Sequence, residues 1–152
     1  KPLCPIGYVQ TKTPLYKRKS VCKYTPEGRK EIHENLKINM EILFRLMKAK
    51  EVNQNIEFMD NRISLYAAQW GKCGVTGRIL EYHDIQCHHI VPRKLGGTDR
   101  YSNLKIMHKD VHTLIHATNQ ETITAYLKLL NLNCSMLAKI NRLRLCANLA
   151  QI

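Results

Sequence analysis

The amino-acid sequence predicts an α+β protein in which a short antiparallel hairpin and a helix form a small core, flanked by several helices. Two β-leaning runs, residues 85–91 and 104–107, are separated by a loop that contains Gly96-Gly97. A helix is expected after the second run, over residues 110–117. On both sides of this centre, apolar residues recur at helical spacing, which predicts helices.

Two helices are expected before the core. Thr25-Pro26-Glu27 is typical of a helix start, with a hydroxyl N-cap, proline at the first position and an acid at the positive end of the helix. Apolar residues from Ile32 onward predict a helix of about 20 residues that ends near Lys50. A shorter helix is expected over residues 60–70, with Gly71 as its stop signal.

Two further helices are expected after the core. Residues 118–121 (TNQE) resemble a capping box that begins with Thr118, and they predict a helix through Leu130. A last helix is expected over residues 135–149. We interpret Cys134 and Cys146, in a leucine-rich segment, as small buried core residues.

The charge of the chain favours a polyanionic partner. Its 152 residues include 24 Lys or Arg against 12 Asp or Glu, which gives a net charge of +12. Residues 1–30 hold eight basic residues against one acid, and residues 71–152 hold eleven against five. Nucleic acid fits such a surface because neutralised phosphates release condensed counterions. A solvated basic surface without a nucleic-acid partner fits the same composition.

Other sequence features predict a cytoplasmic protein without a membrane partner. The chain has no run of about 18 apolar residues, and its first residues lack the apolar centre of a signal peptide. Its six cysteines form no C-x-x-C pair, which favours free thiols in a reducing compartment.

Four histidines in the core segment suggest a metal site and a base. His88 and His89 are adjacent on an expected strand, so their side chains point to opposite faces. His112 and His116 are four residues apart on an expected helix and share one of its faces. We therefore expect one of the adjacent histidines to join the helical pair at a metal ion and the other to face a substrate. A phosphodiester is hydrolysed when a base activates water and a cation neutralises the developing charge.

The central segment resembles the HNH (ββα-metal) endonuclease family in residues 87–99 (CHHIVPRKLGGTD), 101–104 (YSNL) and 112–116 (HTLIH). The resemblance implies that His88, His112 and His116 are metal ligands. It implies that His89 is the general base and that Asn103 braces the loop and orients His89. Mg²⁺ is the expected working ion, although sites rich in imidazole also capture Zn²⁺ or Ni²⁺.

Within that family, the chain is most similar to the C-terminal endonuclease module of group II intron reverse transcriptase/maturases, which belong to mobile elements. The basic arm from Cys4 to Lys23, the helix start at Thr25 and residues 61–66 (NRISLY) carry this similarity. It implies that the protein nicks target DNA during retrohoming and meets intron RNA through its parent protein. The residues expected to contact DNA are Lys17, Arg18, Lys19, Lys23, Arg93 and Lys94.

Many relatives in this family also carry a structural zinc held by two C-x-x-C pairs. The matching positions here are Cys73, Thr76, His108 and Val111, of which only Cys73 and His108 could coordinate a metal. A tetrahedral zinc needs four ligands, so we expect no structural zinc.

Two other functions are compatible with the same residues. One is a basic nucleic-acid-binding module with a structural histidine-metal site, and the other is a free-standing HNH homing or restriction nuclease. His89 favours catalysis, because a structural site has no use for a second histidine on the opposite face. The expected domains are a basic DNA-binding arm (1–24), flanking helices (25–71), the HNH core (72–117) and C-terminal helices (118–152).

Overall fold

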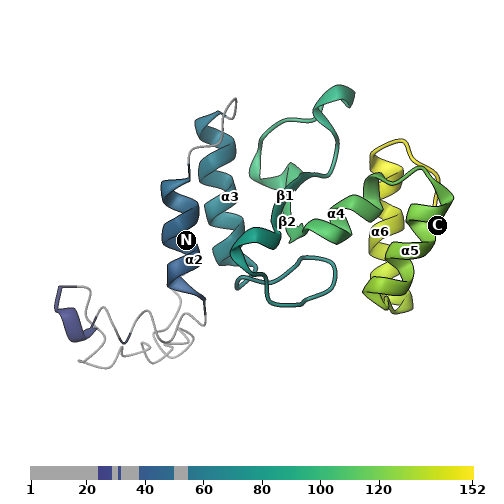
Figure 1. The fold of residues 1–152 in the computed structure, drawn as a ribbon. Coiled ribbons are helices and arrows are strands. Elements are labelled where there is room, and N and C mark those ends of the chain that lie inside the picture. Colours follow the sequence, from purple (N-terminus) through teal and green to yellow (C-terminus); the bar gives the residue numbers. More distant parts are fainter. Residues whose placement is uncertain (1–23, 29–30, 32–37, 50–54) are drawn as a thin grey trace, which may run out of the picture. The chain divides into compact units, whose positions relative to one another are not determined.

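The computed structural model describes residues 24–28, 31, 38–49 and 55–152. The chain divides into two compact units, Lys1–Leu36 and Lys37–Ile152. The second unit holds a two-stranded antiparallel sheet between helices, so the predicted α+β class is confirmed (Figure 1). Its elements are α2 (Met40–Lys48), α3 (Ile56–Ala68), β1 (Ile85–His89), β2 (Leu104–His108), α4 (Lys109–His116), α5 (Gln120–Leu130) and α6 (Cys134–Cys146).

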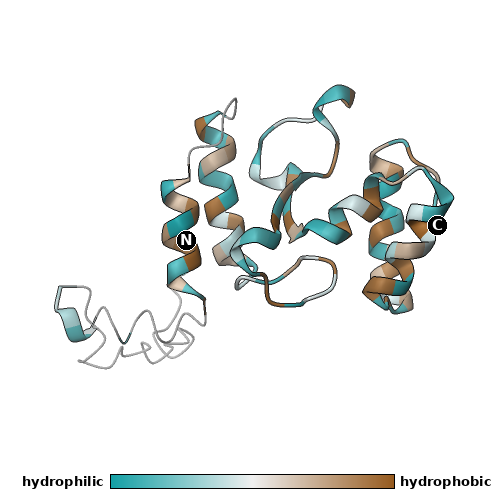
Figure 2. Ribbon diagram, viewed as in Figure 1, coloured by the Kyte–Doolittle hydropathy of each residue, from teal (hydrophilic) through white to brown (hydrophobic). Residues whose placement is uncertain are grey.

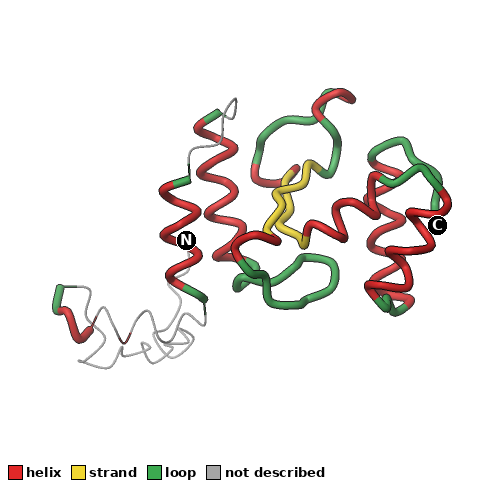
Figure 3. The backbone as a smooth tube through the Cα atoms, in the orientation of Figure 1, coloured by secondary structure: helices red, strands yellow, loops and turns green. Residues whose placement is uncertain are grey.

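The hairpin is the centre of this unit and is drawn in yellow in Figure 3. In its register, His88 lies opposite Lys105 and His89 lies opposite Leu104. The strand β1 is two residues shorter than expected. Beyond His89, the N–H of Ile90 donates to the backbone carbonyl of Asn103 at the end of the connecting loop. This bond continues the ladder by one pair. The ladder ends at Val91, whose N–H donates to the Asn103 side chain instead of a backbone carbonyl.

The connecting loop contains two short 3-10 helices, Arg93–Leu95 and Tyr101–Asn103. Gly97 lies so close to the chain leaving β1 that an added Cβ would be 1.8 Å from the carbonyl oxygen of Val91. Only glycine fits at that position. The sequence therefore permits the loop to fold back against the end of β1.

The core lies between the hairpin, α3 and the three C-terminal helices. The helix α3 contacts β2, while α4 contacts both strands and is itself covered by α5 and α6. Apolar and polar residues alternate around each of these helices, as Figure 2 shows. In α4 and α5 this amphipathic pattern lets the helix bury one face. The side chains with no exposed surface are Leu80, Ile106, Met107, Val111, Leu114, Ile115 and Ile140.

The helices before the core differ from the prediction. A single helix of about 20 residues ending near Lys50 was expected, but α2 begins at Met40. Asn39 has an extended backbone, and its side chain accepts the N–H groups of Glu41 and Ile42, so it starts a new helix. The next helix, α3, begins at Ile56, four residues before the expected start, because Asn55 caps it. Part of the expected helix, residues 32–37, lies outside the described residues.

The C-terminal helices have the predicted order but other caps. Asn119, rather than Thr118, accepts the N–H of Glu121 at the start of α5, so the predicted capping box is wrong. Cys134 is exposed and Cys146 is only half-buried, which corrects their assignment to the core. Cys134 follows the N-cap Asn133 directly, in a first helical turn that faces solvent.

In the first unit, the predicted helix start is confirmed. Residues 26–28 are helical, and Thr25 Oγ1 accepts the N–H of Gly28 at 3.1 Å. Among the helices of the described residues, none combines the length and the apolar composition needed to cross a bilayer.

Candidate active site

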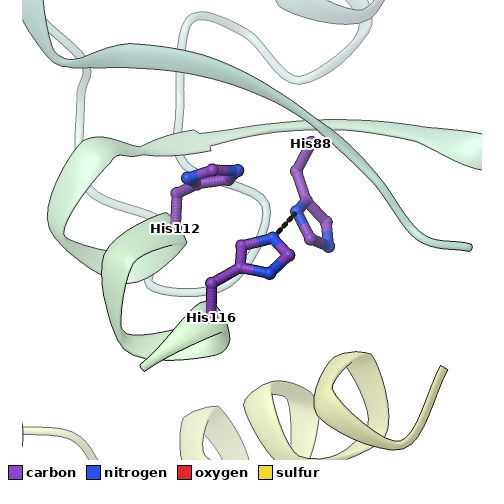
Figure 4. A group of neighbouring side chains, drawn as sticks. All are labelled: His88, His112 and His116. Atoms are coloured by element: carbon purple, nitrogen blue, oxygen red, sulfur yellow. Dashed lines mark hydrogen bonds between the residues drawn. The ribbon is translucent and has the colours of Figure 1, made fainter. Parts of the chain in front are cut away.

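Three histidines from two elements meet beside the hairpin. His88 points from β1 toward α4, where His112 and His116 occupy one face of the helix, one turn apart (Figure 4). One nitrogen from each of the three rings lies within 4.8 Å of the others. His116 Nε2 and His88 Nδ1 are 3.3 Å apart. Such a set of converging imidazole nitrogens fits a transition metal or another divalent cation.

The surroundings keep these three imidazoles in the form that binds metal. His88 is 1% exposed, and burial, together with the neighbouring His112 and His116, lowers its pKa to about 3. Burial, followed by the effect of His116, also lowers the pKa of His112. Burial and the charge of Arg144 lower the pKa of His116. Neutral imidazoles are the ligand form, so the cluster is ready for a cation at neutral pH.

One buried atom of this cluster has no hydrogen-bond partner in the described chain. His88 Nε2 is fully buried and makes no hydrogen bond within the described residues. A polar atom left in this state costs free energy unless a ligand satisfies it. The donor set of the three imidazoles fits a bound metal ion.

Arg144 fixes the end of the helix that carries two of the histidines. It is 3% exposed, and its Nη1 donates to the carbonyl oxygens of Leu114, Ile115 and Ala117. These carbonyls belong to the last turn of α4 and the residue after it, where a helix lacks backbone donors. The guanidinium therefore holds the last turn of α4, which carries His116, against α6.

His89 lies on the other face of β1 and has a separate environment. Its ring stacks on Phe58 of α3, with 5.5 Å between ring centroids and 15° between planes. Its Nε2 is 2.7 Å from Asp99 Oδ1. The two adjacent histidines thus have different neighbours: a pair of imidazoles for His88, and an aromatic ring with a carboxylate for His89.

Asp99 is a residue of this site that sequence reasoning missed. Arg93 donates to Asp99 Oδ1 from Nε at 2.9 Å and from Nη2 at 2.7 Å, while Asn55 donates to Oδ2 at 2.7 Å. Burial raises the pKa of Asp99, but hydrogen bonds from His89 and Arg93 outweigh it and the net shift is downward. The carboxylate is therefore ionised at neutral pH. Its place in the loop was visible in the sequence, but the path that brings it back to His89 was not.

Asn103 closes the loop between the strands. Its side chain donates to the carbonyl oxygens of Val91 at 3.0 Å and Thr98 at 2.8 Å, and it accepts the N–H of Val91 at 2.9 Å. It makes no direct hydrogen bond to the His89 side chain among the described residues. Any effect of Asn103 on His89 passes through the loop backbone that follows β1.

Comparison with known proteins agrees with this geometry. Residues 71–118 match the HNH endonuclease family model. No curated protein and no solved structure matches the chain. The matched segment contains the hairpin, its loop and α4, and thus all four histidines described above. The match supports a nuclease, a hydrolase acting on nucleic acid that uses a divalent metal ion.

An open pocket of about 600 Å³ lies at the end of β1 and is lined by residues of the hairpin, the connecting loop and α4, with Ala147 and Leu149. Its histidine lining is His88, His89, His112 and His116. Two of the predicted DNA-contacting residues, Arg93 and Lys94, line the same pocket. The other four, Lys17, Arg18, Lys19 and Lys23, lie outside the described residues.

The two remaining residues singled out from the sequence lie at the other end of the hairpin. Cys73 is 2% exposed, and its sulfur accepts the backbone N–H of His108 at 3.5 Å. The His108 ring lies between two carboxylates, 3.4 Å from Asp84 and 3.5 Å from Asp110. Within the described part of the chain, the group able to hold a metal includes neither Cys73 nor His108.

Proposed function

We propose that this protein is a metal-dependent endonuclease that hydrolyses phosphodiester bonds of DNA. The proposal is carried by the different environments of two adjacent histidines that line one pocket. His88 joins the imidazoles of α4, whereas His89 bonds to Asp99. One side of β1 thus offers a cation site and the other offers a base.

Each residue has a defined role in the proposed reaction. His88, His112 and His116 would hold a divalent ion, which would supply positive charge against the charge that develops on the phosphate. His89 Nε2–H donates a hydrogen bond to the ionised Asp99 carboxylate, which leaves His89 Nδ1 with the lone pair that a base needs. His89 Nδ1 takes a proton from water while the water oxygen bonds to phosphorus and the bond from phosphorus to the leaving sugar oxygen breaks. The leaving oxygen keeps the electron pair of that bond and takes up a proton from solvent.

The exposure of the three ligands favours catalysis over a structural metal. His88 is buried and His112 is half-buried, but His116 is exposed and borders the pocket. A structural site is closed by a fourth protein ligand, whereas a catalytic site keeps a position open for water or substrate. The three histidines form the metal-ligand group of the described chain. All three line the open pocket, so water or substrate would have access to an ion bound there.

A plasmid-nicking assay tests the proposal. The full chain should convert supercoiled DNA to the nicked form with Mg²⁺ and should lose this activity in EDTA. His89→Ala should abolish most of the activity, with a loss of about 10²–10⁴-fold. His83→Ala is the matched control because His83 is exposed and is not among the residues that line the pocket. If His89→Ala nicks DNA as fast as His83→Ala does, the catalytic proposal is wrong and a binding module remains.

The finer proposal is that the nick serves group II intron retrohoming and that the chain acts inside the cell, on DNA. Its support is the resemblance of the arm from Cys4 to Lys23, of the helix start at Thr25 and of residues 61–66 to the maturase layout. The same layout supports the division at residues 24, 71 and 117. An assay with a retrohoming target and intron ribonucleoprotein should show a nick on the strand that the RNA does not enter. A nick at random positions would instead favour a free-standing nuclease.

A further inference from the structure

A second pocket, of about 380 Å³, lies between the hairpin and α6. Three cationic side chains line it: Lys105 from β2, and Lys139 and Arg142 from α6. The other lining residues are apolar side chains and Cys146, so no lining residue from the described chain is acidic. The lining of this pocket therefore combines three positive charges with apolar side chains.

None of the three cations forms an ion pair within the described residues. Other basic side chains of this unit do have acidic partners, such as Lys109 with Asp84 at 2.7 Å. Cations that converge on one pocket repel one another, and an anion bound among them relieves that repulsion.

The position of Lys105 is set by the backbone around it. An added Cβ at Gly74 would lie 2.9 Å from Lys105 Cγ and 3.0 Å from Cδ, so the lysine stem occupies the space that glycine leaves. Lys105 is half-buried. Lys139 and Arg142 are exposed and three residues apart, which places them on the same face of α6.

This pocket adjoins the histidine cluster. Lys105 lies directly opposite His88 in the hairpin, and paired residues of antiparallel strands point to the same face with Cβ atoms about 4.5–5.5 Å apart. At the end of α6, Cys146 lines the cationic pocket, while the next residue, Ala147, lines the pocket of the histidines. Neighbouring residues of both the hairpin and α6 therefore line the two pockets.

We infer that Lys105, Lys139 and Arg142 bind a backbone phosphate of the nucleic acid, beside the phosphate that is cleaved. The inference rests on the proposed function for the identity of the ligand. Lys139 and Arg142 lie outside residues 71–118, so the site is contributed by α6 together with the HNH segment. The cations position the strand through charge and read no sequence.

Direct binding to labelled nucleic acid in EDTA tests this site without requiring cleavage. The full chain, Lys105→Gln and the double variant Lys139→Gln/Arg142→Gln are compared by fluorescence anisotropy over a range of salt concentrations. The slope of log K against log salt is negative, and loss of each phosphate contact with duplex DNA should reduce its magnitude by about 0.9. Lys105→Arg should retain the slope, and Lys128→Gln, an exposed lysine on α5, is the matched control. Circular dichroism of every variant verifies the fold.

Parallel arms with duplex DNA and duplex RNA of the same sequence identify the source of the phosphate. A shallower slope for Lys105→Gln and for the double variant, with Lys128→Gln unchanged, supports the site. Slopes equal to that of Lys128→Gln in both arms overturn it, even if the parent protein nicks DNA. If the parent protein does not nick DNA but these variants still bind with a shallower salt dependence than the parent, the catalytic proposal fails and the phosphate site stands.

Discussion

Asp99 and His89 are ten residues apart in the chain, yet Asp99 Oδ1 lies 2.7 Å from His89 Nε2. The loop between β1 and β2 folds back to bring them together. The carboxylate is itself held by Arg93 and by Asn55, which precedes α3. The position of the carboxylate therefore depends on the loop and on the start of a helix earlier in the chain. The carboxylate in turn orients the His89 ring through one hydrogen bond.

The first prediction is that Asp99→Asn slows cleavage without changing metal affinity. The neutral amide makes a weaker hydrogen bond to His89 than the charged carboxylate does, so the imidazole is less well oriented. Because Asp99 acts through His89, the loss in kcat should not exceed the whole contribution of the base, about 10²–10⁴-fold. Nicking kinetics and calorimetry with Mn²⁺ measure the two quantities. Asp60→Asn, an exposed site on α3, is the control, and equal kcat values for the two variants would refute the prediction.

The second prediction concerns the division of labour between the adjacent histidines. His88→Ala should weaken metal binding, because His88 completes the group formed with His112 and His116. High Mn²⁺ or Mg²⁺ should then restore part of its activity. His89→Ala should keep the metal affinity of the parent and remain slow at any metal concentration. Calorimetry measures the metal affinity of each variant, and nicking rates over a range of metal concentrations measure the rescue. The opposite pattern would mean that the roles of His88 and His89 are exchanged.

The third prediction concerns the stability of the metal-free protein. Burial, followed by the neighbouring histidines, lowers the pKa of His88 to about 3, whereas an unfolded histidine titrates near about 6.5. Below that pH the unfolded chain binds more protons than the folded one. The contribution of His88 to the free energy of unfolding is therefore fully present above about pH 6.5. It is lost as the pH falls toward the pKa of His88 in the folded protein, by up to about 1.4 kcal/mol per pH unit.

Urea unfolding in EDTA at neutral and mildly acidic pH measures this effect. His88→Gln should reduce the difference in the free energy of unfolding between the two pH values, because it removes the histidine whose pKa is shifted most strongly of the three. His83→Gln, at an exposed position, should leave that difference unchanged. Identical pH dependence in both variants would exclude His88 as the source.

The fourth prediction concerns the basic arm. Residues 1–24 hold six Lys or Arg and no acid, so removing them should weaken DNA binding and make its salt dependence shallower. Unit Lys37–Ile152 contains the described core, and the truncated protein should therefore still fold. An unchanged slope of log K against log salt would show that the arm contacts something other than DNA.

The local order of the core followed from the sequence by itself. Alternation along a strand placed His88 and His89 on opposite faces, and the helical repeat placed His112 and His116 on one face. Both are short-range consequences of backbone geometry. The helix starts were harder to predict, because Asn39, Asn55 and Asn119 compete as caps with other polar residues nearby.

The tertiary structure decided which distant groups complete the site. Asp99 reaches His89 only because Gly97 lets the loop approach Val91. Lys105 meets the cations of α6 only because that helix packs against α4. Such contacts depend on the path of a loop and on the packing of helices, which sum many weak interactions over the whole chain, whereas the face on which a side chain lies depends on a few neighbouring residues.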